Sequence, residues 1–288
     1  PAPPPQAPPP ETTPDTPAQS EASLEMERHF AWLQAELLAQ GLLRSDGGGP
    51  DAPFSADDLV SNFERIALYD EYVLDRGRFV ARESESVLRR WTRPVRIGVR
   101  FGDGVPPEQR RKDMRTIGIY ATRLARATGH PVSFGIGEPN FHVLILREDE
   151  RRSYRRELAD LGIALSEGDI AGILRMPRST LCHVFGFSGV VEPNVYDRAV
   201  AVIRAEHPDH LRRACIHEEL AQGLGLANDS RRARPSIFND DEEFGVLTGH
   251  DELLLRMLYD PRLRPGMTPD EARPVLEQLA RELLAGEG

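Results

Sequence analysis

The chain has 288 residues, 40% of them hydrophobic, which is enough for one large domain or two small ones. Its 46 acidic residues exceed its 36 basic residues, giving a net charge of −10. This acidic excess argues against a partner made of nucleic acid and against an anionic membrane surface. The sequence has no run of about 18 apolar residues, so we expect no transmembrane span.

The first 20 residues contain nine of the 24 prolines and no aromatic or branched apolar residue. Such a segment cannot bury enough surface to offset its ordering entropy, so residues 1–20 are predicted to be a disordered, polyproline-like tether. The chain begins at Pro1 rather than Met, which indicates a processed N-terminus. We expect the tether to follow a cleaved signal peptide or a lipid anchor ahead of residue 1. A proline-rich ligand for a partner module is the alternative.

The N-terminal part of the chain after the tether is predicted to be helical. Apolar residues recur at helical spacing from Leu24 to Leu38, and the pattern stops at Gly41. Ser55, followed by two aspartates, is a start signal for a second helix. Residues 74–91 are expected to continue as a helix, so residues 21–91 form an N-terminal helical region.

The hydrophobic period changes at residue 95. Residues 95–101 alternate strictly, which predicts a half-buried strand, and residues 107–129 return to a helical pattern. A short polar helix is expected at 151–161. Further strands are predicted at 132–136, 141–146, around 173–174, at 181–185 and at 199–203. This order predicts an α+β or mixed α/β fold, with residues 92–288 as one domain.

Cys182 and Cys215 are the two cysteines of the chain and are 33 residues apart. A cysteine pair in an exported chain can close one disulfide, which would contribute about 3–4 kcal/mol in the chain-entropy model. Two unconnected buried thiols are the alternative. We predict the disulfide, and with it a location outside the cytoplasm.

The segment 211–229 carries the most informative pattern of the sequence. Ile216, Leu220 and Leu224 lie four residues apart and form one apolar stripe on a helix. Gly225 permits a sharp turn that would return the following residues towards the end of that helix. Five polar residues are expected around this helix end: Glu218, Glu219, Gln222, Asn228 and Asp229.

The string from Glu218 to Asn228 resembles the H-E-x-x-H-x-L-G-L-x-H signature of the metzincins, especially of their matrixin branch. Glu219 matches the general base and Gly225 the turn. The three ligand histidines are replaced, by Glu218, Gln222 and Asn228. The resemblance implies a zincin-like fold, a mixed sheet with an active-site-type helix, and a cleft between the edge strand and that helix.

Other stretches extend the resemblance. Leu247-Thr248, Asp251 and Leu258-Tyr259 resemble the C-terminal helix of the matrixins, and residues 235–238 lie where that family has a Met-containing turn. Over about residues 55–275 the chain resembles a bacterial family of uncharacterised exported proteins and lipoproteins, that is, a domain of unknown function. The shared stretches include Ser-Ile-Phe-Asn-Asp and Leu-Tyr-Asp-Pro-Arg-Leu.

The replaced residues change the metal chemistry that this helix could support. Zinc peptidases need neutral imidazoles at i and i+4, with a glutamate that takes a proton from bound water. Glu218, Gln222 and Asn228 or Asp229 offer only oxygen, which suits calcium, magnesium or manganese better than zinc. We therefore expect no tightly bound cofactor, and a weakly bound divalent cation as the alternative.

Other candidate groups have ordinary structural explanations. His217, His142 and His250 could rebuild a metal site, but surface or hydrogen-bonded histidines are the commoner outcome. The acidic segment 239–243 lacks the spacing of a calcium-binding EF-hand loop, so a solvated turn is expected. Glu218 and Glu219 are adjacent and diverge by about 100° on a helix, which favours a solvated helix edge over a catalytic pair.

The sequence is compatible with three functions. The first is a catalytically degenerate, zincin-like pseudo-peptidase in the periplasm or secreted, bound to a protein or peptide partner in the cell envelope. The second is an active metal-dependent peptidase or hydrolase with Glu219 as general base. The third is a structural subunit of an envelope complex. The motif with replaced ligands favours the first.

Overall fold

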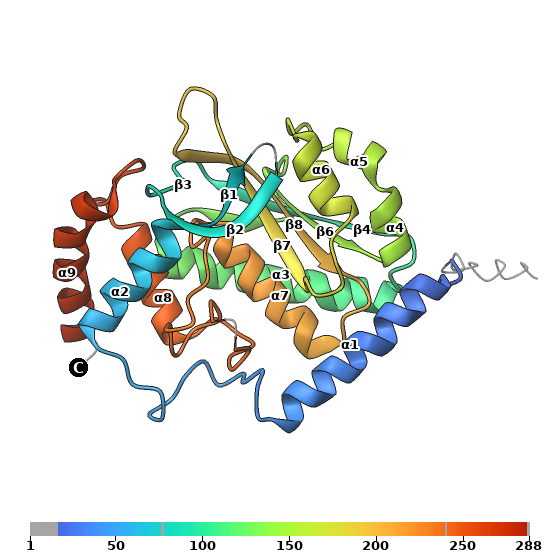
Figure 1. The fold of residues 1–288 in the computed structure, drawn as a ribbon, viewed down its shortest axis with the longest axis horizontal. Helices are drawn as coiled ribbons and strands as arrows, with labels where there is room; N and C mark the ends of the chain where they lie inside the picture. The colour runs from blue at the N-terminus through green and yellow to red at the C-terminus, as the bar shows by residue number, and fades with distance from the viewer. Residues whose placement is uncertain (1–16, 76–77, 240, 287–288) are drawn as a thin grey trace, which may run out of the picture.

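The computed structural model describes residues 17–75, 78–239 and 241–286, so most of the expected tether lies outside the described residues. A mixed six-stranded sheet runs through the molecule and carries helices on both faces (Figure 1). Nine helices occur within the described residues. None of the helices in this part of the chain has the length and apolar character needed to cross a membrane. The fold is therefore mixed α/β.

Five strands of this sheet are parallel, in the order β3-β8-β6-β4-β5. Their bounds are Arg90–Trp91 for β3, Val95–Phe101 for β4, Val132–Phe134 for β5, Phe141–Leu146 for β6 and Val195–Arg204 for β8. The sixth strand, β7 (Cys182–Ser188), pairs antiparallel with β8. The strands predicted at 95–101, 132–136, 141–146, 181–185 and 199–203 are thus confirmed.

The two central strands, β6 and β8, are apolar on both faces because helices cover both faces. Val143 and Ala201 belong to the main core together with residues of α3 (Pro107–Thr128) and α7 (Asp209–Gln222). Leu144 and Val202 belong to a second core that includes residues of α5 (Arg155–Ala159) and α6 (Glu167–Leu174). This double burial explains the continuous apolar run of β6.

Two helices precede the sheet, as predicted. The first, α1 (Glu21–Ala39), is capped by Ser20 and lies across one end of the molecule near α4 (Glu148–Ser153) and α7 (Figure 1). The second, α2 (Ala56–Ala67), begins at Ser55 in a reciprocal capping box with Asp58. At the C-terminus, α8 (Gly249–Leu258) and α9 (Pro269–Ala285) both contact α2.

The helix expected at 74–91 is wrong. An antiparallel hairpin of β1 (Tyr69–Asp75) and β2 (Arg78–Glu85) occupies this segment, and β3 adds to the main sheet beside β8. Aromatic and β-branched residues in Tyr-Asp-Glu-Tyr-Val-Leu and Arg-Phe-Val favour strands. The apolar pattern is short, so it is compatible with the period of a helix as well as with that of a strand. The N-terminal region 21–91 is therefore helical only up to residue 67.

The strand expected around residues 173–174 is also wrong. These residues end α6, which Ser166 begins with a capping box to Asp169. The Ser-x-x-Asp pattern is a helix start signal in the sequence. In this short apolar segment the start signal outweighs the strand-like composition. The polar helix expected at 151–161 is divided into α4 and α5, which meet at Tyr154.

Candidate functional site

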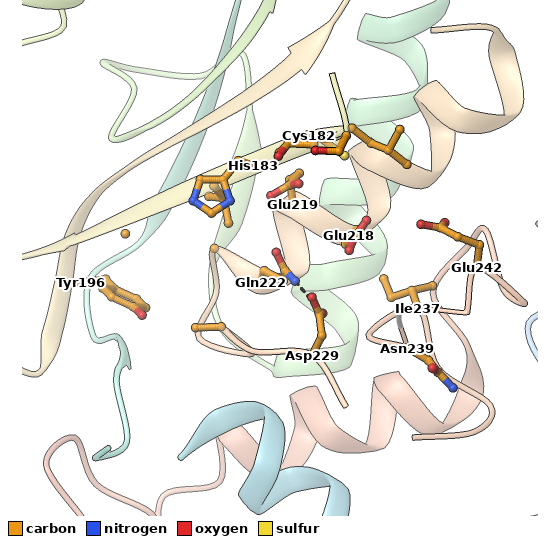
Figure 2. A pocket seen from close by; sticks show the side chains of 17 residues that line it. Cys182, His183, Tyr196, Glu218, Glu219, Gln222, Asp229, Ile237, Asn239 and Glu242 are labelled. Carbon is orange, nitrogen blue, oxygen red and sulfur yellow. Dashed lines mark hydrogen bonds between the residues drawn. The ribbon is translucent and has the colours of Figure 1, made fainter. Parts of the chain in front are cut away.

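A pocket of about 310 Å³ lies between β7 and α7 (Figure 2). One wall is formed by residues 179–184 and Gly186, and α7 contributes Glu218, Glu219 and Gln222. Asp229 follows the turn after α7, and the opposite side is lined by Ile237, Asn239 and Glu242. The structure thus places a cleft between the edge strand and the helix that carries the motif.

Close backbone packing fixes the end of α7. Adding a Cβ at Gly223 would place it 2.4 Å from the ring of Phe141 on β6, so only glycine fits there. Trp91 donates a hydrogen bond from Nε1 to the carbonyl of Gly223 at 2.8 Å. Gly225 has a φ of 127°, and a Cβ there would lie 2.4 Å from the carbonyl oxygen of Arg89. Glycine is required at both positions to hold the helix end against the sheet.

The turn after α7 brings Asp229 back to the helix. The side chain of Gln222 donates from Nε2 to Asp229 Oδ1 at 3.0 Å (Figure 2). Asn228 is directed elsewhere, because its Nδ2 donates to the carbonyl of Arg65 at 3.0 Å and its backbone N–H to Ile66. Of the predicted metal ligands, Glu218, Gln222 and Asp229 therefore line the pocket together, and Asn228 packs against the end of α2.

Glu219 is the buried acid of the pocket. Its residue is 3% exposed, and its Oε2 atom has no hydrogen-bond partner among the described residues. Burial raises the pKa of this carboxyl well above its ordinary value, and the negative charge of Asp229 adds to the shift. The prediction of a solvated helix edge is therefore wrong for Glu219, because the start of β7 at Cys182 lies over this side chain.

The two cysteines form the predicted disulfide. Cys182 begins β7 and Cys215 lies on α7, with their Cα atoms 5.8 Å apart. The bond ties the edge strand to the helix beside Glu218 and Glu219, whose carboxylate oxygens lie within 4.8 Å of the Cys182 sulfur. Because the sulfur is in a disulfide, it does not offer a thiolate to a metal ion.

A comparison with protein families matches residues 56–278 to the family described as "Protein of unknown function (DUF2927)". The chain belongs to the DUF2927 family. No curated protein and no solved structure matches the chain. The predicted resemblance to a domain of unknown function over about 55–275 is thus confirmed, and the metzincin relationship stays a prediction.

The histidines of this DUF2927 chain do not converge on a metal site. His217 accepts a hydrogen bond at Nδ1 from the backbone of Leu247 at 3.1 Å, and burial lowers its pKa to about 3. His250 accepts one at Nε2 from the Asn62 amide at 3.1 Å. His142 lies on β6, where burial lowers its pKa. Each ring belongs to a separate packed environment.

Zinc does not fit the residues around the pocket. Within the described residues, one group of three potential ligand side chains has ligand atoms within 4.8 Å of one another, namely Cys182, Glu218 and Glu219. It offers two carboxylates and a disulfide sulfur, whereas zinc sites in proteins combine any carboxylate with imidazole nitrogen or thiolate sulfur, which this group does not supply. The described residues around the pocket of this DUF2927 protein therefore do not supply the ligands of a zinc site.

Two further residues of the pocket were not singled out from the sequence. His183 on β7 and Tyr196 on β8 both line it, and burial lowers the pKa of His183 and raises that of Tyr196 (Figure 2). A Cβ at Gly186 would lie 2.9 Å from the Tyr196 ring, so glycine leaves room for this ring across the two strands. Only the position of His183 next to Cys182 could have indicated its place.

Proposed function

We propose that this DUF2927 protein is a zincin-like domain outside the cytoplasm that binds an extended segment of a protein or peptide and lacks peptidase activity. The observation that carries the proposal is the edge strand β7, which forms one wall of the pocket and pairs with β8 alone in the described part of the chain. An edge strand beside a pocket is the arrangement that binds extended peptides by strand addition.

The register of β7 indicates which of its backbone groups are available. The N–H of Ala199 on β8 points towards the β6 side, where it bonds Asn140. Because backbone direction alternates along a strand, Val200 of β8 directs its backbone groups towards β7, where its register partner is Phe185. Val184 and Gly186 then direct their N–H and C=O groups away from β8. Both residues line the pocket, so a peptide added at this edge would lie over it.

Three features support the zincin-like part of the proposal. The helix that carries the motif follows β8 directly and lies beside an antiparallel edge strand. Glu219, at the position of the general base in the resemblance, lines the pocket. Gly225 makes the turn that returns the chain to the helix end.

The active-hydrolase alternative has less support. A general base must be ionised to take a proton from water, and burial favours the protonated form of Glu219. The imidazoles that would hold zinc are replaced by Glu218 and Gln222. The structural-subunit alternative predicts that these polar side chains are enclosed in the fold, whereas both line the pocket.

The proposed location outside the cytoplasm, with a partner in the cell envelope, is supported by the Cys182–Cys215 disulfide. Structural disulfides persist in the periplasm and outside the cell and are rare in a reducing cytosol. The acidic balance of the chain is compatible with a protein or peptide partner and unfavourable for nucleic acid.

The test begins with selection of binders from a random heptapeptide display library, followed by fluorescence anisotropy with a selected peptide. Val184→Pro should weaken binding, because it removes one N–H from the exposed edge of β7; that bond is worth about 0.5–1.5 kcal/mol, or about two- to tenfold in affinity. Val191→Pro is the matched control, since Val191 is an exposed residue of the β7–β8 loop. It should leave the affinity unchanged.

An N-methyl scan of the same peptide gives a readout that does not depend on protein variants. Strand addition predicts that N-methylation weakens binding at every second residue, because alternate peptide N–H groups face β7. Uniform effects along the peptide would contradict strand addition. Stoichiometric zinc in the gently purified protein would contradict the proposed loss of the zinc site.

A further inference from the structure

The pocket between β7 and α7 is lined by acids. Four acidic side chains contribute to it: Glu218, Glu219, Asp229 and Glu242. Although the chain has 36 basic residues, none of the described residues that line the pocket is lysine or arginine. The lining therefore favours a positively charged occupant.

A single buried atom adds to this preference. The Oε2 atom of Glu219 has no hydrogen-bond partner among the described residues, and the residue is 3% exposed. Figure 2 shows the Glu219 carboxyl beside Cys182, within the space between β7 and α7. A buried acceptor without a donor is unfavourable, so a ligand that donates a hydrogen bond there removes a cost that the free protein carries.

We propose that the pocket binds an arginine or lysine side chain of the peptide that lies along β7, with the Glu219 carboxylate as its counter-ion. This inference rests on the proposed function, because it names the ligand class of the same cleft. The side chains of an added strand alternate, so one side chain of the peptide points towards α7 while its neighbours point away.

The geometry favours an organic cation over a metal ion. Calcium needs six to eight oxygen ligands at 2.3–2.6 Å, whereas the ligand group here has two carboxylates and the disulfide sulfur of Cys182. Asp229 Oδ1 already accepts a hydrogen bond from the Gln222 amide, and the Asn228 side chain is directed to α2. A pocket of about 310 Å³ is also far larger than one ion.

The shape of the lining suits a guanidinium group in particular. A guanidinium presents five donors in a plane, which matches a carboxylate in a bidentate pair. It also stacks on aromatic rings, and the rings of His183 and Tyr196 line the same pocket (Figure 2). We therefore expect arginine to bind more tightly than lysine.

The experiment uses blocked heptapeptides, acetyl-Thr-Ala-Thr-Xaa-Thr-Ala-Thr-amide, in which Xaa is arginine, lysine, leucine or citrulline. Citrulline has the shape of arginine without its charge. Isothermal titration calorimetry of the full chain gives the affinity of each peptide. We expect the arginine peptide to bind at least tenfold more tightly than the citrulline peptide.

Glu219→Gln should reduce the arginine-to-citrulline ratio to near one. Glu167→Gln is the matched control, because Glu167 is an exposed acid on α6 with a side chain 80% exposed, and it should keep the ratio. The ratio compares two ligands on one variant, so partial loss of folding cancels.

Other results would overturn the inference in distinguishable ways. Equal binding of the arginine, leucine and citrulline peptides would leave peptide binding intact and refute the cation pocket. Failure of all four peptides at millimolar concentration would contradict the proposed function as well. Glu219-dependent, stoichiometric binding of CaCl₂ or MnCl₂ alone, without discrimination between arginine and citrulline, would identify a metal site instead.

Discussion

Removal of the Cys182–Cys215 disulfide tests the coupling between the edge strand and the helix. The bond joins β7 to α7 across a sequence separation of 33 residues. In the chain-entropy model, opening a loop of this length costs about 3.7 kcal/mol at 25 °C. For a chain of this size each kcal/mol corresponds to about 2–4 °C, so the melting temperature should fall by about 7–15 °C.

The assay is thermal unfolding of the wild type and of the Cys182→Ala/Cys215→Ala double variant, each with and without a phosphine reductant. The wild type should lose stability on reduction, and the double variant should not respond to the reductant. Thiol titration of the denatured protein, before and after reduction, establishes the state of the two cysteines. A fully reduced wild type that is less than 1 kcal/mol less stable would refute the loop-entropy reasoning.

Two other substitutions test the packing and charge of the pocket. Glu219→Gln should flatten the pH dependence of the unfolding free energy. Because the pKa of Glu219 is raised in the folded state, its contribution to stability is fully present below the unfolded-state pKa of 4.5 and is lost as the pH rises. The loss is at most about 1.4 kcal/mol per pH unit. Denaturant titrations between pH 4.5 and 8 measure this slope, and an equal slope in the variant would contradict it. Gly223→Ala should cost about 1–3 kcal/mol through contact with Phe141, whereas Gly249→Ala, with nothing within 4 Å, should cost less than about 0.5 kcal/mol in the same titration.

Local signals in the sequence were sufficient for most elements. The alternation at 95–101 and the run at 141–146 predicted β4 and β6, and Ser55 predicted the start of α2. The disulfide followed from the count of two cysteines. These features depend on nearest neighbours along the chain or on composition, which a sequence shows directly.

The hairpin at 69–85 and the burial of Glu219 depend on contacts between distant segments. The strands β1 and β2 are short, and a short apolar pattern fits a helix as well as a strand. Glu219 is buried because β7 and the Cys182 disulfide cover it, and no local pattern indicates this neighbour. Glu218 is half-buried and Glu219 is buried, and the helical period alone could not assign this difference between adjacent acids.

The orientation of Asn228 has the same origin. Its amide bonds the carbonyl of Arg65 at the end of α2, more than 160 residues earlier in the chain. In the motif alone, Asn228 and Asp229 are equivalent candidates for the third ligand position. The position of α2 decides between them, and it leaves Asp229 at the pocket.

The contacts that hold α7 in place are independent of the side chains at positions 218 and 222. Trp91 bonds the carbonyl of Gly223, and the Tyr259 hydroxyl donates to the carbonyl of Leu224 at 2.9 Å. Both bonds end on backbone oxygens, so the helix end would keep its place with any side chain at 218 or 222. Substitution at these positions therefore changes the chemistry of the pocket without removing its walls, so the same cleft can carry different selectivities for what it binds.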